Sequence, residues 1–305
     1  MASYGLCVLL IVLIVQTCSV YVQGEIIKSS LTFVIDDTGS MADEIRQLKE
    51  EVNTIFEKVS SSNASQIENF VVVTFNDPDA ELRTITKDKD EFKRALAEIR
   101  VHGGDDCPEY AMTGIQLALT NSLPLSYLYV FTDASAKDYS MFEQIKSIAQ
   151  KKQSQVVFIL TGTCGLTGAS DAEYQVYHQV AQATGGQVFH VMKDDVKDIL
   201  KYVEESITGR GVQIVNSKYP AGTHKVKFNI DAHTEDVLIS LSGLGSKIGE
   251  VTGPDGTKLT TEPIVSGKDK IAVKKVSIST PGDYEVEIEG RMEVHLIVST
   301  FRNGN

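Results

Sequence analysis

The sequence has 305 residues, of which 42% are hydrophobic and 23% charged, and this is the composition of a soluble globular protein long enough for two domains. Its formal net charge is −12. Proteins that bind nucleic acid need basic surface, so the charge argues against a nucleic-acid partner.

The amino terminus is predicted to be a targeting segment, with residues 1–24 forming a signal peptide. An apolar core from Leu6 to Val15 is followed by small and polar residues. The core is short for a membrane span and has the length of a signal h-region, although an uncleaved anchor is an alternative. We therefore expect a secreted, extracellular protein with no membrane span after the signal is removed.

From Leu31 onward, apolar runs typical of buried strands alternate with segments of helical spacing. Strands are predicted at 31–36, 69–75, 83–86, 126–133, 155–160 and 187–191. Helices are predicted at 41–60, 89–99, 108–122, 141–152, 172–184 and 194–207. This alternation predicts an α/β domain over residues 25–211, with a doubly wound, mostly parallel sheet.

Residues 212–305 have a different pattern, in which apolar side chains alternate with period two and no helix is predicted. Strands are expected within 224–231, 236–243, 248–259, 271–280 and 282–290, and the sequence from Gly253 to Gly256 is typical of a hairpin turn. Several short strands separated by turns predict an independently folded β-sandwich.

Acidic and hydroxyl side chains cluster where three segments of the α/β domain end. Asp36, Thr38 and Ser40 follow the first strand, Asp105, Asp106 and Glu109 lie in a second loop, and Asp133 follows the strand at 126–133. Loops at the carboxyl ends of parallel strands share one edge of the sheet. Hard oxygen donors there predict a divalent cation, Mg²⁺ first and Mn²⁺ or Ca²⁺ as alternatives. A cation held by few carboxylates keeps an affinity for an acidic side chain of an extracellular partner.

Two cysteines, Cys107 and Cys164, remain after the signal peptide. An even pair in a secreted chain predicts a disulfide, which would stabilise the fold by roughly 3–4 kcal/mol, although two free buried thiols are an alternative. Asn63, in the sequence Asn-Ala-Ser, is a predicted glycosylation acceptor.

The stretch "FVIDDTGSM" resembles the D-x-[ST]-x-S motif of von Willebrand factor A domains, and "VFTD" resembles their later metal-site aspartate. The resemblance covers roughly residues 29–211. It implies a metal-ion-dependent adhesion site with Asp36, Thr38, Ser40 and Asp133 as ligands. Many such domains supply a threonine as the middle ligand, whereas this sequence offers acidic residues, with Asp106 as first choice and Glu109 as second.

The sequences "GGDDCPEY", "YVFTDASAKDY" and "KKQSQVVFILTGTC" are similar to the amino-terminal part of hemicentins. That resemblance implies an extracellular-matrix or cell-adhesion protein. It also implies that residues 212–305 form a galactose-binding-like β domain, which makes this domain a candidate for glycan contact.

Other interpretations of the same motif stay open. Asp37 is also a candidate helix N-cap, which explains one residue but not the set. "DDTGS" further resembles the D-K-T-G-T loop of HAD-like, Mg²⁺-dependent aspartyl phosphotransferases and phosphatases, with Asp133 and Asp138 as a second acidic motif. An acidic neighbour of the nucleophile would repel phosphate, so we expect a protein that is not an enzyme. A metal-independent interaction domain with a degenerate site is a further alternative, and the six histidines are expected to be structural or on the surface.

Overall fold

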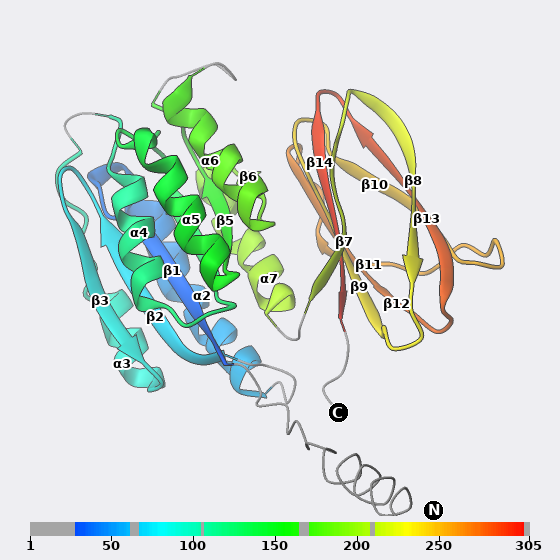
Figure 1. Cartoon of the computed structure of the whole chain (residues 1–305), viewed down its shortest axis with the longest axis horizontal. Helices are drawn as coiled ribbons and strands as arrows, with labels where there is room; N and C mark the ends of the chain where they lie inside the picture. Colours follow the sequence, from blue (N-terminus) through cyan, green and yellow to red (C-terminus); the bar gives the residue numbers. More distant parts are fainter. Residues whose placement is uncertain (1–27, 62–66, 105–106, 165–170, 208–210, 302–305) are drawn as a thin grey trace, which may run out of the picture.

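The computed structural model describes residues 28–61, 67–104, 107–164, 171–207 and 211–301 (Figure 1). The predicted signal peptide, Asn63, Asp105 and Asp106 lie outside these ranges. Among the described residues, no helix has the length and apolar character needed to cross a bilayer.

The first domain is built on a six-stranded sheet in the order β3-β2-β1-β4-β5-β6, in which only the edge strand β3 runs antiparallel to its neighbour. The strands are β1 (Ser29–Asp36), β2 (Ile67–Phe75), β3 (Ala80–Thr86), β4 (Tyr127–Thr132), β5 (Gln155–Leu160) and β6 (Val188–His190). The predicted α/β fold with a mostly parallel sheet is confirmed.

Helices cover both faces of this sheet, as its continuously apolar strands require. They are α2 (Ala42–Ser61), α3 (Lys89–Ala97), α4 (Ala111–Asn121), α5 (Phe142–Lys152), α6 (Ala172–Thr184) and α7 (Val196–Ser206), with short 3-10 turns η1 (Gly39–Met41), η2 (Tyr139–Met141) and η3 (Lys193–Asp195). One buried cluster joins the sheet to α2, α3 and α7, and a second joins it to α4, α5 and α6.

The strand order contains a topological switch point between β1 and β4. After β1 the chain builds β2 and β3 on one side, and it then crosses to the other side of β1 to form β4. The loops that leave β1 and β4 therefore diverge to opposite faces and leave a crevice at the carboxyl edge, where ligands bind in such sheets. Asp36 ends β1 and Asp133 directly follows β4.

The second domain is a β-sandwich of a three-stranded sheet, β10-β13-β8, and a five-stranded sheet, β11-β12-β9-β14-β7. Its strands are β7 (Val212–Tyr219), β8 (Gly222–Ile230), β9 (Asp236–Ser242), β10 (Lys247–Thr252), β11 (Glu262–Val265), β12 (Ile271–Ser277), β13 (Gly282–Gly290) and β14 (Val294–Phe301). Apolar side chains from both sheets form a core of their own.

Some predicted element boundaries were wrong. The helix expected from residue 108 begins at Ala111, because the carboxylate of Asp138 accepts hydrogen bonds from the backbone N–H groups of Met112 and Thr113 and so caps that turn. The turn at Gly253–Gly256 is present, but the arm that follows makes only one bridge, Thr252 to Lys258, and no long hairpin. Strands β7, β11 and β14 were not predicted at all.

The two domains are joined by a mixed apolar and polar interface around α7, which lies between the domains in Figure 1. Leu238, Val265, Ile271 and Val273 of the β domain belong to the same buried cluster as the inner face of α7. Beside it, Glu205 of α7 pairs with Lys275 at 3.1 Å. The five-stranded sheet therefore buries part of its outer face against the first domain.

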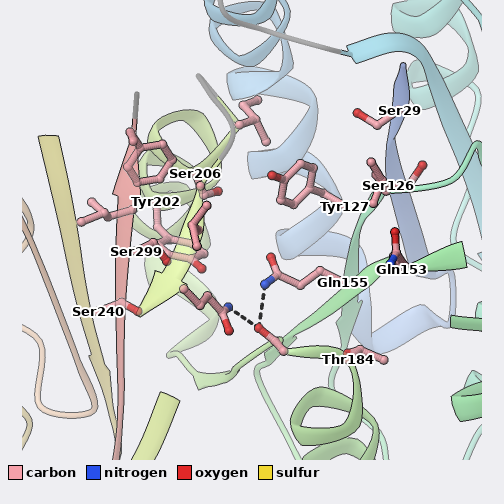
Figure 2. Close-up of a pocket in the computed structure, with 18 of the residues that line it drawn as sticks. Ser29, Ser126, Tyr127, Gln153, Gln155, Thr184, Tyr202, Ser206, Ser240 and Ser299 are labelled. Carbon is pink, nitrogen blue, oxygen red and sulfur yellow. Dashed lines mark hydrogen bonds between the residues drawn. The ribbon is translucent and has the colours of Figure 1, made fainter. Parts of the chain in front are cut away.

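A cavity of about 350 Å³ lies between the domains, near the amino-terminal edge of the parallel sheet (Figure 2). The side chains of Gln155 and Gln213, one from each domain, both donate hydrogen bonds to the carbonyl of Gly185. None of the described residues that line the cavity is charged.

The side chain of Gln187 makes polar contacts across the interface and has no exposed surface. Its amide nitrogen donates to Ser242 Oγ at 3.1 Å and to the carbonyl of His295 at 2.9 Å, while its oxygen accepts from Ser240 Oγ at 2.6 Å. One side chain of the α/β domain thus satisfies three polar groups of the sandwich.

Replacing Gln187→Ala should lower the free energy of unfolding by about 2 kcal/mol, because buried partners are left without hydrogen bonds. Gln179→Ala, at an exposed position of α6, is the matched control and should change stability by at most a few tenths of a kcal/mol. Urea unfolding of both variants measures the difference. Equal effects of the two substitutions would show that the interdomain contact adds nothing to stability.

Candidate functional site

The predicted motif after β1 forms a compact hydrogen-bonded turn around Asp36, whose side chain is fully buried. One carboxylate oxygen accepts from the backbone N–H of Thr38 at 3.0 Å and from the Thr38 hydroxyl at 2.6 Å. The other accepts from the hydroxyl of Thr132, the last residue of β4, at 2.6 Å. Asp36 therefore ties the β1 loop to the end of β4 at the switch point.

Burial raises the pKa of Asp36 to about 6, because the ionised carboxylate has lost its water. Hydrogen bonds from Thr132 and Thr38 lower the pKa and offset part of this effect, while the charge of Asp133 raises it further. The hydrogen bonds therefore compensate the buried carboxylate only in part, and a nearby positive charge would stabilise its ionised form.

Asp133 and Ser40 extend the same network outward. The hydroxyl of Ser40 lies 3.3 Å from that of Thr38 and donates to Asp133 Oδ1 at 2.9 Å. All four residues expected as the main ligands are therefore connected, from buried Asp36 through Thr38 to exposed Ser40 and then to Asp133.

A lysine that the sequence analysis did not single out also enters the site. Lys193, in η3, donates to Asp133 Oδ2 at 2.7 Å and to the carbonyl of Ser40 at 2.7 Å. Its ammonium lies 3.3 Å from Oε1 of Glu44, whose side chain is only 2% exposed. Burial alone would lower the pKa of Lys193, but the two carboxylates raise it overall, so the ammonium stays charged. Lys193 follows β6 by three residues, and no local sequence pattern relates it to Asp133.

Asp37 faces away from this network, and the N-cap of η1 is Thr38 and not Asp37. Its carboxylate accepts from the Asn76 amide at 2.9 Å, and its backbone carbonyl accepts from the N–H of His102 at 2.9 Å. Gly103 and Gly104 follow with positive φ, and a Cβ at Gly104 would lie 3.1 Å from Thr38 Cβ. Only glycine lets this second loop pass so close to the first.

Of the two candidates for the middle ligand, Asp106 lies outside the described residues, and Glu109 is buried, with 2% of its surface exposed. The backbone of Glu109 bonds to Ser135 and Lys137 in the loop after β4. The predicted Cys107–Cys164 disulfide is present, with Cα atoms 5.6 Å apart. It ties the second loop to the segment after β5 beside the site.

The donor set fits a hard divalent cation. Within the described ranges, no three His, Cys, Asp or Glu side chains are grouped as metal ligands. The candidate set is instead two carboxylates, Asp36 and Asp133, and the hydroxyls of Thr38 and Ser40, all hard oxygen donors. The ammonium of Lys193 already stands at Asp133 as a cation, and Glu44 Oε2 is buried without a hydrogen-bond partner. A positive charge is therefore favoured here.

The residues required by the phosphotransferase interpretation are engaged elsewhere. Both carboxylate oxygens of Asp36 accept hydrogen bonds, and its side chain has no exposed surface. Asp138 is used to cap α4. Neither arrangement presents a free carboxylate to an incoming phosphate.

Three histidines that are far apart in the sequence meet in a second cleft between the domains. His178 and His190 stack with ring centroids 5.9 Å apart, and His295 of the β domain lines the same cleft. Burial lowers the pKa of each to about 4, so all three are neutral at pH 7. Structural or surface positions were expected for the histidines, and these three are partly buried. No local sequence pattern indicates their cluster, because it depends on how the two domains dock.

Comparison with known proteins agrees with this architecture. A family model described as von Willebrand factor A domain matches residues 30–193, which is more than half of the chain. The chain belongs to the von Willebrand factor A domain family. The match includes every candidate ligand and Lys193, and it stops before the sandwich, so the galactose-binding-like assignment of residues 212–305 stays a prediction.

Several relatives of this A-domain chain are much longer proteins. Hemicentin-1 of Mus musculus is 40% identical over 231 residues, which cover 75% of this chain and 4% of that protein. Hemicentin-2 of Mus musculus is 36% identical over 275 residues, covering 88% and 5%. The von Willebrand factor A domain-containing protein 7 of Homo sapiens is 32% identical over 222 residues, covering 70% and 25%. The chain therefore spans only a small part of these relatives.

The solved structure of a von Willebrand factor type A protein from Catenulispora acidiphila is also similar, with a TM-score of 0.46 and 12% identity. The similarity covers 91% of this chain and 65% of that one.

The raised pKa of Asp36 predicts a specific pH dependence in metal-free buffer. Between its ordinary value of 3.8 and about 6, the folded state keeps a proton that the unfolded chain has released, so stability falls as pH rises through this window. Asp36→Asn removes the titration. The free energy of unfolding of Asp36→Asn relative to the parent should therefore increase by about 2 kcal/mol between pH 4 and 7.

Urea unfolding in EDTA at several pH values measures this difference. Asp79→Asn, at an exposed position, is the control and should follow the parent at every pH. If Asp36→Asn also runs parallel to the parent, Asp36 ionises normally in the fold.

Proposed function

We propose that this chain is a secreted adhesion-type protein that binds an extracellular partner through a divalent cation at the edge of its A domain. Mg²⁺ is the first candidate, with Mn²⁺ and Ca²⁺ as alternatives. Asp36, Thr38, Ser40 and Asp133 would hold the ion, and Asp106 or Glu109 would complete the set from the second loop.

One observation carries the proposal. Oxygens from the loops after β1 and β4 form a single connected set at the switch point, with neighbouring atoms 2.6–3.3 Å apart. These side chains come from positions almost a hundred residues apart, and a helix N-cap would need only one of them. Such convergence at a switch point is expected of a ligand site.

The partner is expected to offer a carboxylate. Thr38 and Ser40 are neutral donors, which limits the negative charge placed on a divalent cation and leaves it able to take an anionic ligand. A third carboxylate, from Asp106 or Glu109, would neutralise the ion further and weaken this attraction. Ser40 is exposed, whereas Asp36 is buried beneath it, which leaves the outer side of the ion for the partner. When bound, the ion would supply the electrostatic attraction, and the protein would supply its position.

We propose no catalytic role. Asp36 is enclosed, and Asp138 caps a helix, so the residues that a phosphotransferase would use already have structural partners. A phosphatase assay on an artificial phosphomonoester, with and without Mg²⁺, should show no turnover above that of Asp36→Ala.

Metal should stabilise the folded protein, because an ion that binds only the native state shifts the unfolding equilibrium by mass action. Millimolar Mg²⁺ or Mn²⁺ should raise Tm by a few degrees in the parent. Asp36→Ala and Asp133→Ala should abolish this rise, while Asp37→Ala, whose carboxylate accepts from the Asn76 amide outside the Asp36 network, should keep most of it. Absence of any shift with all three cations would favour a degenerate site and a metal-independent interaction domain.

The adhesion role is tested by recovering the full-length protein from culture medium and comparing the extracellular proteins it retains in Mg²⁺ and in EDTA. Retention of one or more proteins that is lost both in EDTA and in Asp133→Ala would support the proposal. Identical recovery in Mg²⁺ and EDTA, or a protein that stays inside the cell, would contradict it.

A further inference from the structure

The ammonium of Lys193 is bonded to Asp133, a carboxylate that the proposed metal ion would use as a ligand. This ammonium lies 2.7 Å from Asp133 Oδ2 and 2.7 Å from the Ser40 carbonyl. Of the candidate carboxylates that the structure describes, Asp36 and Glu109 are buried, whereas 11% of the Asp133 side chain is exposed. The ammonium therefore neutralises the most accessible of these carboxylates, Asp133.

Its position is enforced by the backbone around it. The carbonyl of Lys193 accepts a hydrogen bond from the buried Gln47 side chain at 2.7 Å, and Gln47 also accepts from the N–H of Lys197 at 3.1 Å. Asp195, two residues after Lys193, pairs with Lys268 of the β domain at 2.6 Å. The turn η3 is thus anchored to α2 on one side and to the β domain on the other.

We infer that Lys193 is a tethered cation that competes with the divalent ion for Asp133 and so sets the affinity of the site. This inference rests on the proposed metal site and deepens it. Because the ammonium is held beside Asp133 by the fold, its effective concentration there is high, and a metal must displace it before Asp133 can become a ligand.

Glu44 gives the displaced ammonium a second partner. Its Oε1 accepts from Thr161 at 2.7 Å and lies 3.3 Å from the lysine, while its Oε2 is buried without a hydrogen-bond partner. A small swing of the flexible side chain from Asp133 toward Glu44 would keep the lysine paired and free Asp133 for the metal. The competition is then a choice between two carboxylates, and it requires no unpaired charge.

The test is calorimetric titration of the folded, full-length protein with Mn²⁺ and with Mg²⁺. Lys193→Met keeps the length of the side chain and removes the charge, and should tighten metal binding roughly tenfold, about 1.4 kcal/mol. Lys193→Arg, which keeps the charge, should bind metal about as weakly as the parent. Lys197→Met, at an exposed position four residues further on, changes the net charge equally and should leave the affinity close to that of the parent.

A second measurement guards against misfolding. In EDTA, Lys193→Met should melt below the parent because Asp133 and Glu44 lose their cation, and metal should restore it by a larger Tm shift than in the parent. If Lys193→Met and Lys197→Met bind metal with the same affinity as the parent, the inference is overturned while the metal site stands. If no variant binds either ion at millimolar concentration, the proposed function and the inference both fail. Binding by Lys193→Met alone would support the inference most strongly.

Discussion

The carboxylate of Asp36, which has no exposed surface, fixes the geometry of the switch point between β1 and β4. It ends the central strand β1, and it accepts hydrogen bonds from the next loop and from the end of β4, so both sides of the switch point are fixed to it. Burying an anion is unfavourable, which explains why its pKa is raised and why the surrounding groups are hydroxyls and a backbone N–H. A bound cation would relieve the same unfavourable desolvation of Asp36, so the proposed metal site would stabilise the residue whose burial opposes folding.

The second domain bears on this site through one short segment. The turn η3 carries Lys193 toward Asp133 and Asp195 toward Lys268, and it leads directly into α7, whose inner face packs on the β domain. Gln187, just before β6, adds a buried polar contact with the five-stranded sheet. The sandwich has its own core, and it also anchors η3, the segment that places the Lys193 ammonium in the candidate site.

Much of the first domain could be predicted from the sequence because its signals are local. Continuous apolar runs gave the buried strands, helical spacing gave the helices, and the order of elements gave the parallel sheet. The loops after β1 and β4 share an edge for topological reasons, so the proximity of Asp36 and Asp133 could also be foreseen. The disulfide followed from the cysteine count and the predicted signal peptide.

What the sequence could not provide depends on contacts between distant segments. Strand β7 is largely exposed and has weak alternation, and β14 lies near the end of the chain after a short turn, so neither stood out. Lys193 and Glu44 come together only through the placement of α2 and η3 in the fold. The three histidines meet only where the two domains dock. The start of α4 was misplaced because its cap, Asp138, comes from a loop after the helix in the chain.

A crystal structure of the protein grown with Mn²⁺ would show whether the switch point holds a divalent cation, since anomalous scattering locates this ion. We expect an anomalous peak within coordination distance of Ser40 Oγ, with Asp133 turned toward the ion and the Lys193 ammonium moved to Glu44. Millimolar Mn²⁺ with no peak at this edge, and with Lys193 still bonded to Asp133, would contradict this expectation.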